Sequence, residues 1–487
     1  MKILVVGGGT AGLVAATLLQ SKLDAQVDLV FSKEIGTVGV GEGSTEHFNE
    51  FVETLGLDPY VLLRETNATL KSGIVFSGWN PQRPFMHAVM HEFAIKNGQY
   101  HYLYGRQIAN NDHYLNSQLN WDSVLNKWFL NRREELPTNQ YHFNTNMMGE
   151  FLTKVAEEIG CKVFDDEITD VVIKENGYVQ KVRGNKRDYV YDFYVDATGF
   201  ARTLIGPLGA KWNSFSEHMR MNSAITFQTE NDDENFPLWT LAQAMDSGWM
   251  FRLPTWDHTG NGYIYDKEFV DEDGAKAEVE KLLGREVTIG KRFSFDPGHL
   301  DRPWINNVCA VGLASAFVEP LEATSIGTSI QQSFLLAARL MNYDDKSVES
   351  YNRSFVAIME NIRDYICLHY VTPRRDTEFW KAIADMPLPE RLNERLAHWK
   401  HHLPISEDFL VDSSGSDFHL FGDANYILLM EGLELFDRRS IKKEYMAQSK
   451  LIRDAADDAL ARHKQFISSI PVVSHKGYVA MTRDVFS

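Results

Sequence analysis

The sequence predicts an α/β fold whose central layer is a doubly wound, mostly parallel sheet. An all-apolar strand at residues 3–6 runs into a glycine-rich turn and then into an apolar helix, which is the local order that such sheets require. Much later, after a helix and a hairpin that turns at Asn176-Gly177, a second strand ends in the letters DATG at residues 196–199. Asn-Gly is a strong hairpin signal. We expect the strand that follows this hairpin to return to the sheet that residues 3–6 begin.

Length, charge and cysteine content narrow the class of protein. The chain has 487 residues, 44% of them apolar, enough for two or three interlocked lobes. A formal net charge of −18 disfavours nucleic acid and anionic membranes as partners. The three cysteines form no CxxC pair and no histidine pair has metal-ligand spacing, so we expect neither a metal site nor a disulfide framework. We find no span of 18 apolar residues and no signal-peptide pattern, so we expect a cytoplasmic protein without a membrane segment.

The first turn carries a GxGxxG pattern between a strand and a helix. Gly7 permits the tight turn, Gly9 lets a pyrophosphate approach the backbone, and Gly12 lets the helix pack on the sheet. Thr10 and Ala11 complete the loop where the helix begins, and the helix N-terminus favours phosphate charge. We interpret this turn as a dinucleotide site. The alternative is a glycine-rich turn without a ligand.

Two further segments should complete the nucleotide site. The second strand, "AQVDLVF", should end near a carboxylate that holds the adenosine ribose, but Phe31 occupies that position and Glu34 is the nearest carboxylate. The stretch "VGVGEGS" frees the backbone for close approach to the isoalloxazine end of a flavin, with Val40, Gly41 and Gly43 as candidate contacts. A flexible surface loop is the alternative for that stretch.

A helix, a hairpin and a strand ending in D-[AC]-[ST]-G is the order found in glutathione-reductase-type FAD domains, with an inserted sheet. Asp196 and Gly199 belong to this second nucleotide element, and Gly312 and Ile326 to a later strand and a long helix expected from about Thr324. The predicted FAD-binding module is discontinuous, and an interleaved, partly helical substrate lobe with a C-terminal helical region takes up the rest. The module comprises residues 1–80, 140–210 and 290–345, and the lobe and C-terminal region comprise 81–139, 211–289 and 346–487.

These segments, taken in order, resemble the flavin-dependent halogenases of the tryptophan-halogenase type. The resemblance spans about residues 1–380, and whether this is a viral member of that family is left open. The motifs that carry it are "VGGGTAG", "VGVGEGS", "ATLKSGIVFSGW", "YHFNTNMMGEFL", "DFYVDATGFARTLIG", "GWMFRLPTWDHTGNGYIY", "NVCAVGLASAFVEPLEATSI" and "IRDYICLHYVTPRRDTEFW".

The stretch "GWMFRLP" is similar to the family's W-x-W-x-I-P signature. Trp249 and Pro254 match it, whereas Phe251 stands at the second tryptophan and Leu253 at the isoleucine. Phe251 replaces the second tryptophan and loses only an indole N–H. The resemblance implies that this element lies near the flavin and keeps substrate away from it. A second departure is Ala323, where the family usually has serine, which leaves the orientation of the neighbouring glutamate open.

The resemblance implies a two-component enzyme. Reduced FAD (FADH2) and O2 oxidise a halide to hypohalous acid, which travels along a walled, dry passage to Lys71, the residue that positions the electrophilic halogen. Glu322 assists Lys71 or takes the proton from the substrate. Thr324 and Ser325, at a helix start, are the candidates for the halide pocket. The alternatives are a snorkelling lysine and a plain N-cap.

The implied partners are a separate flavin reductase and a small electron-rich aromatic substrate of indole or phenol type, with chloride, bromide and iodide all open as the halide. No second GxGxxG unit is present for a nicotinamide cofactor, which fits the need for a reductase. A flavin-dependent monooxygenase or reductase of the same superfamily is the alternative, and a non-catalytic flavin-binding protein is a third hypothesis. A homo-oligomer is also left open.

Overall fold

A parallel sheet forms one half of the molecule. In a computed structural model of the chain, the described residues are 1–36, 41–88, 100–114, 140–231, 237–410, 420–469 and 474–484. Six strands run in the order β20-β21-β12-β1-β2-β8, and every pair is parallel except β20 with β21. Their bounds are β1 (Lys2–Val6), β2 (Gln26–Phe31), β8 (Lys162–Asp165), β12 (Phe193–Asp196), β20 (Trp304–Ile305) and β21 (Val308–Ala310).

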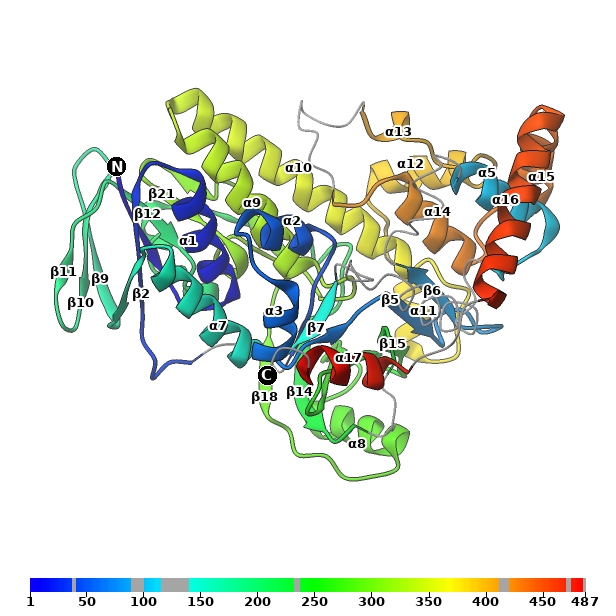
Figure 1. Cartoon of the computed structure of the whole chain (residues 1–487), viewed down its shortest axis with the longest axis horizontal. Helices are drawn as coiled ribbons and strands as arrows, with labels where there is room; N and C mark the ends of the chain where they lie inside the picture. The colour runs from blue at the N-terminus through cyan, green and yellow to red at the C-terminus, as the bar shows by residue number, and fades with distance from the viewer. Residues whose placement is uncertain are drawn as a thin grey trace.

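Each face of this sheet is covered by a different kind of element (Figure 1). Alternate residues point to opposite faces of a strand, so Ile3 and Val5 pack with helices while Leu4 and Val6 join a separate cluster containing Val182. The helices on the first face are α1 (Thr10–Lys22), α7 (Thr145–Glu158) and α9 (Thr324–Leu340). The second face carries the antiparallel strands β9 (Ile168–Ile173), β10 (Val179–Gly184) and β11 (Asp188–Tyr189). This is the predicted hairpin, which turns where Gly177 has φ +82°.

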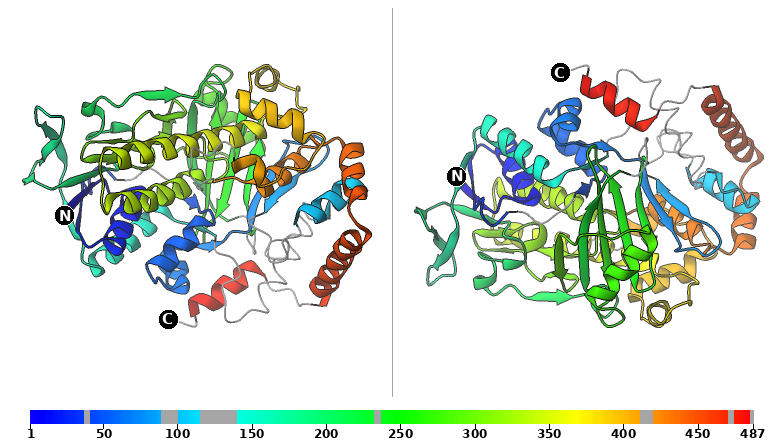
Figure 2. Two further views of the ribbon diagram at one scale, coloured as in Figure 1. Left: turned by 90° about the horizontal axis from the view of Figure 1, so that it is seen from above. Right: turned by 90° about the horizontal axis from the view of Figure 1, so that it is seen from below.

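A seven-stranded sheet forms the second half, in the order β18-β14-β17-β16-β15-β5-β6. Its pairs are antiparallel except β15 with β5, and Figure 2 shows the early strands β5 and β6 beside the later ones. The strands are β5 (Gly73–Ser77), β6 (Phe85–Ala88), β14 (Ser223–Thr229), β15 (Thr240–Ala244), β16 (Gly248–Pro254), β17 (Thr259–Tyr265) and β18 (Lys291–Ser294).

Two three-stranded sheets and short 3-10 helices join the two halves. One sheet runs β3-β7-β4 and the other β13-β19-β22. The elements are β3 (Glu42–Gly43), β4 (Thr69–Leu70), β7 (Tyr141–Phe143), β13 (Trp212–Ser214), β19 (Gly298–Leu300), β22 (Ala316–Phe317), η2 (Gly199–Ala201), η3 (Gly206–Leu208) and η4 (Gly312–Ala314).

The remaining described elements are helices, most of them in the C-terminal third. The long helix α10 runs beside α9, and α15 and α16 lie at the end of the molecule opposite β9–β11 (Figure 1). The helices are α2 (His47–Thr54), α3 (Pro59–Glu65), α5 (Tyr100–Asn110), α8 (Glu272–Leu283), α10 (Asp345–His369), α11 (Glu378–Ala384), α12 (Glu390–Trp399), α13 (Glu407–Leu410), α14 (Asp423–Gly432), α15 (Arg438–Ala447), α16 (Lys450–Ser469) and α17 (His475–Asp484).

The α/β class and the long helix at Thr324 are as predicted, because both follow from local patterns. All six strands of the parallel sheet lie inside the three segments predicted for the FAD-binding module, whereas β5, which falls in the first of those segments, joins the seven-stranded sheet. None of the described helices is long and apolar enough to cross a membrane.

Candidate active site

A cavity of about 1270 Å³ opens beside the β1–α1 turn. Gly7 has φ +120°, and a Cβ there would lie 2.2 Å from the carbonyl oxygen of Ala197, so only glycine fits the turn. Gly12 is also closed to a side chain, because its Cβ would lie 2.0 Å from the Gly7 carbonyl oxygen. A Cβ on Gly9, in contrast, would meet no described atom within 4 Å and would enter the cavity. A dinucleotide pyrophosphate needs this kind of open backbone.

Most of the predicted cofactor residues line this one cavity. They come from the β1–α1 turn, the start of β3, the turn after β12, η4 and α9: Gly7, Gly9, Thr10, Ala11, Gly41, Gly43, Gly199, Gly312 and Ile326. Asp196 does not line it. Its carboxylate instead accepts the N–H groups of Thr198, Leu204 and Ile205 and so fixes the turn that carries Gly199. Val40 lies outside the described residues.

The predicted ribose carboxylate, Glu34, is exposed and does not line the cavity, although Ser32 and Lys33 beside it do. Two other carboxylates, Asp166 and Glu167, line the same end. They follow β8, which pairs with β2, so a search limited to the end of β2 missed them.

The start of α9 forms another part of the wall and has the features of an anion site. The helix begins at Thr324 after Ala323, which has φ +55° and no side chain able to cap the first N–H groups. The Thr324 hydroxyl is buried and has no hydrogen-bond partner among the described residues, and both Thr324 and Ser325 line the cavity. Free N–H groups and a helix dipole together stabilise a bound anion.

Strand β16 divides its motif residues between two roles. Phe251 and Leu253 line the cavity, but Trp249 and Pro254 do not. The indole N–H of Trp249 donates to Glu319 Oε2 at 2.6 Å, and the carbonyl of Pro254 accepts the Thr69 hydroxyl at 2.6 Å. The side chain of Phe251 therefore forms part of the cavity wall together with Leu253. Trp249 instead connects β16 by a hydrogen bond to the segment that precedes α9.

Glu319 is a fully buried carboxyl group that we did not identify from the sequence. Its Oε2 also accepts the Tyr370 hydroxyl at 2.6 Å, while Oε1 has no partner among the described residues. Burial raises the pKa of Glu319 to about 7, although the two hydrogen bonds lower it. A second acid, the half-buried Glu42, lines the large cavity, and loss of solvent around its carboxyl group raises its pKa to about 7.

A second, smaller cavity of about 50 Å³ brings the two predicted catalytic residues together, since both Lys71 and Glu322 line it. Lys71 lies between β4 and β5 and is 2% exposed. Its ammonium group donates to the carbonyl oxygen of Ser44 at 2.7 Å. Burial lowers the pKa of Lys71 to about 8, and the nearby charge of Glu322 partly opposes this.

Two histidines hold Glu322. Its Oε2 lies 2.9 Å from Nδ1 of His87 on β6, and its Oε1 lies 2.7 Å from Nε2 of His369 at the end of α10. Burial alone would raise the pKa of Glu322, but the charge of His87, the hydrogen bonds from both histidines and the charge of His369 outweigh it and lower the pKa to about 2. Glu322 is therefore a carboxylate at neutral pH.

Further hydrogen bonds hold the two imidazole rings in place. His369 Nδ1 lies 2.9 Å from the carbonyl oxygen of Tyr365. His87 Nε2 lies 3.2 Å from the amide nitrogen of Asn425. These bonds orient Glu322 without the hydroxyl that Ala323 lacks.

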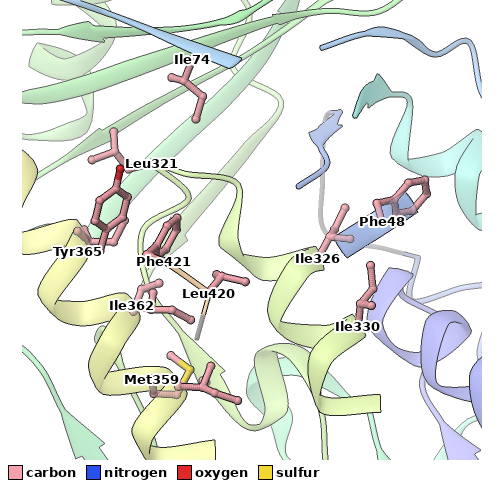
Figure 3. Close-up of a cluster of buried hydrophobic side chains, with 14 of the residues drawn as sticks. Phe48, Ile74, Leu321, Ile326, Ile330, Met359, Ile362, Tyr365, Leu420 and Phe421 are labelled. Atoms are coloured by element: carbon pink, nitrogen blue, oxygen red, sulfur yellow. The ribbon is translucent and has the colours of Figure 1, made fainter. Parts of the chain in front are cut away.

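The two cavities adjoin at β5, because Ile74 lines both. Figure 3 shows Ile74 near Leu321, with Phe421 and Leu420 coming from the segment before α14. Leu321 lines the large cavity, whereas Phe421 and Leu420 line the small one. The boundary between the cavities is thus apolar.

The three cysteines and the histidines His87, His142 and His369 are all buried. Cys161, Cys309 and Cys367 are free and buried, and no group of three or more metal-ligating side chains occurs in the part of the chain that the structure describes. The sequence assigns no role to His87 or His142, and the structure places both near Lys71 or Glu322. The only sequence signal for His369 was its place in the motif "CLHY".

The chain is similar to known proteins over most of its length. The model of the tryptophan halogenase family matches residues 2–448. The tryptophan 6-halogenase SttH from Streptomyces toxytricini is 28% identical over 96% of this chain and 97% of its own length. The tryptophan 7-halogenase RebH from Lentzea aerocolonigenes is also 28% identical, over 96% and 97% of the two chains.

Solved structures show the same fold. The crystal structure of SttH superposes with a TM-score of 0.82 at 26% identity and covers 99% of both chains. Tar14, a tryptophan C-6 flavin-dependent halogenase from taromycin biosynthesis, gives a TM-score of 0.86 at 24% identity, again over 99% of both chains. At that identity the likeness to Tar14 concerns the fold.

Proposed function

The chain belongs to the tryptophan halogenase family, and we propose that it is a flavin-dependent halogenase that delivers electrophilic halogen to an electron-rich aromatic substrate through Lys71. The observation that carries this proposal is the position of Lys71 and Glu322, which are buried and line one small cavity that adjoins a much larger one at Ile74. Oxidant formation and halogen transfer thus have separate chambers.

The large cavity fits FAD. The open space at Gly9 suits a pyrophosphate, and the apolar residues Phe251 and Leu253 suit an isoalloxazine ring. Bound as FADH2 with O2, the flavin supplies the oxidising power that converts halide to hypohalous acid. Thr324 and Ser325 would hold the halide at the start of α9, because the unpartnered Thr324 hydroxyl and the uncapped helix end both favour an anion.

The apolar boundary at Ile74 and Leu321 keeps water from the oxidant on its way to Lys71. The pKa of about 8 leaves Lys71 partly neutral near that pH. The neutral amine can take the halogen as a haloamine, and the ammonium can hydrogen-bond hypohalous acid. Either form holds the electrophile at a fixed position, which sets the site of attack on the substrate.

Glu322 acts as the base in this proposal. A ring that has gained a halogen must lose a proton, and a carboxylate that stays ionised at neutral pH can accept it. An aromatic ring is larger than the 50 Å³ of the small cavity, so substrate binding requires side chains of the wall to move. A separate flavin reductase is the expected electron source.

The test is a panel of halides and substrates. Purified protein, FAD and an added reductase are supplied with chloride, bromide or iodide and with indoles and phenols, and products are read by mass spectrometry. We expect products in which halogen replaces hydrogen, and none without halide. Hydroxylated products that need no halide, together with direct flavin reduction by NAD(P)H, would establish the monooxygenase or reductase alternative instead.

A further inference from the structure

One carboxylate in the small cavity has no role in the scheme above. Glu46 precedes α2 as its N-cap residue and lines the same cavity as Lys71, His87 and Glu322. It is two residues from Ser44, whose carbonyl oxygen accepts the Lys71 ammonium. A substrate that reaches Lys71 therefore also comes close to Glu46.

The carboxylate of Glu46 has no hydrogen bond or ion pair within the described residues. It is partly buried and is no N-cap acceptor, because no side-chain bond caps α2. Its backbone is fixed, since the N–H of Glu46 donates at 2.9 Å to the Gln140 side chain when that amide is turned to present its oxygen. A held backbone and an unpaired side chain are features of a group kept for a ligand.

The basic side chains around Glu46 have hydrogen-bond partners other than Glu46. His87 donates to Glu322, and Lys71 donates to Ser44 and interacts with Glu322. His47, which follows Glu46, has its pKa lowered to about 4 by burial, and its Nε2 lies 3.1 Å from the Gln331 amide nitrogen. Burial raises the pKa of Glu46, and the charge of His87 lowers it in part. His87 itself is hydrogen-bonded to Glu322, so the cavity contains a carboxyl group that no cation among the described residues hydrogen-bonds or pairs with.

Resting on the proposed function, we infer that Glu46 selects the substrate. The substrate is an aromatic compound that presents a cationic amine to Glu46 while its ring lies between Lys71 and Glu322. The apolar residues Ile74, Ala88 and Phe421 of the same cavity suit the ring. Aromatic acids are disfavoured, because their carboxylate would meet Glu46 in a poorly solvated site.

Three indoles that differ only in the tail at ring position 3 test this inference: one with an aminoethyl group, one with a hydroxyethyl group and one with a carboxyethyl group. Binding to the FAD-loaded protein is measured by calorimetry, so that no turnover is needed. The variant is Glu46→Gln. The matched control is Glu50→Gln, which removes the same charge from the exposed side of α2.

We expect the wild-type protein to bind the amine about tenfold or more tightly than the acid, and Glu46→Gln to weaken amine binding by about tenfold or more, as is usual for a lost hydrogen bond to a charged group. Binding of the alcohol should change by less than about threefold, and Glu50→Gln should behave as wild type.

Unchanged amine affinity in Glu46→Gln, tighter binding of the acid than of the amine, or no binding of the amine to the wild-type protein would each overturn the inference. Halide-dependent products from other aromatic compounds would leave the proposed function standing in all three cases.

Discussion

Glu322 lies between His87 and His369, and this pairing determines how the residue can act. A buried carboxylate without partners would take up a proton. Here two imidazole N–H groups stabilise the charge, so the base is ready before the substrate arrives. The distances of 2.9 and 2.7 Å also fix its direction.

We predict that Glu322→Gln slows halogenation while the reoxidation of reduced flavin stays nearly intact. The amide keeps the shape of the side chain but cannot accept a proton, and loss of a positioned base commonly costs about 10²-fold or more. Stopped-flow flavin spectra and product yield, measured side by side, separate the two steps. An equal loss in both would mean that Glu322 serves the flavin or the fold.

A second prediction concerns pH. With a pKa of about 2, Glu322 should remain ionised at every working pH of the wild-type protein. His369→Gln removes the imidazole that hydrogen-bonds Glu322 at 2.7 Å and should raise the pKa of Glu322, so halogen transfer in the variant should fall relative to wild type as pH drops from 8 to 5. His299→Gln, a buried histidine that lines neither cavity, is the control. A variant-to-wild-type ratio that is constant with pH would contradict this role.

Among the elements, β16 both lines the large cavity and is hydrogen-bonded to the segment that leads to α9. Phe251 faces the large cavity, while Trp249 donates to Glu319 in the segment that leads to Glu322 and α9. Movement of β16 would therefore displace the candidate halide site and Glu322 together.

We predict that Trp249→Phe destabilises the protein by about 1–3 kcal/mol, because the buried Glu319 carboxyl group loses one of two donors. The folded pKa of about 7 exceeds the ordinary value of 4.5 for a glutamate, so the contribution of Glu319 to stability is lost as pH rises from about 4.5 through 7. Loss of a donor to the anion should enlarge that effect.

Melting temperatures of wild type and Trp249→Phe should accordingly differ more at pH 8 than at pH 5. Trp380→Phe is the matched control, since its indole N–H donates to the Met245 carbonyl oxygen, which does not titrate. The same deficit at both pH values in Trp249→Phe would show that its hydrogen bond to Glu319 adds nothing beyond packing.

The β1–α1 turn gives a prediction on cofactor binding. Gly9→Val should weaken FAD binding sharply with little loss of thermal stability. The new side chain meets no described protein atom near its Cβ but enters the space that a pyrophosphate needs. Titration by flavin fluorescence, paired with a melting curve of the FAD-free protein, is the measurement. Unchanged affinity would remove the nucleotide assignment from this turn.

The elements that the sequence predicted are those with local signals. The glycine-rich turn, the hairpin at Asn176-Gly177 and the start of α9 are each determined by residues close in the chain. The parallel pairing of β5 with β15 has no such signal, because it joins residues 74–77 to residues 240–243. A single sequence does not indicate which distant strands become neighbours.

The same reason explains the missed site residues. His87 and Glu322 are 235 positions apart, and Trp249 and Glu319 are 70 apart, so neither pair forms a motif. Lys71, Glu322, Thr324 and Ser325 were predicted from the family resemblance. Glu46 lies two residues beyond the glycine-rich stretch "VGVGEGS", which ends at Ser44, and matches no expected position.

At the scale of the whole molecule, residues of both the parallel sheet and the seven-stranded sheet line the large cavity, and strands β5 and β6 at the edge of the seven-stranded sheet line the small one. Lys71 lies where the chain passes from β4 of a connecting sheet to β5 of the seven-stranded sheet. In the proposed function, this arrangement separates oxidant formation from halogen transfer, and that proposed separation is the central claim.

Turnover by Lys71→Ala tests this claim most directly, with FAD, a reductase, halide, an indole substrate and a chemical trap for free hypohalous acid. The residues proposed above to hold flavin and halide, Gly9, Phe251, Leu253, Thr324 and Ser325, line the large cavity and not the small one. We therefore predict that FAD binding and oxygen consumption persist and that free oxidant or peroxide is released. Halogenated product should fall by at least about 10²-fold. Product formed at a comparable rate and with unchanged regioselectivity would contradict the claim, because freely diffusing oxidant would then do the chemistry.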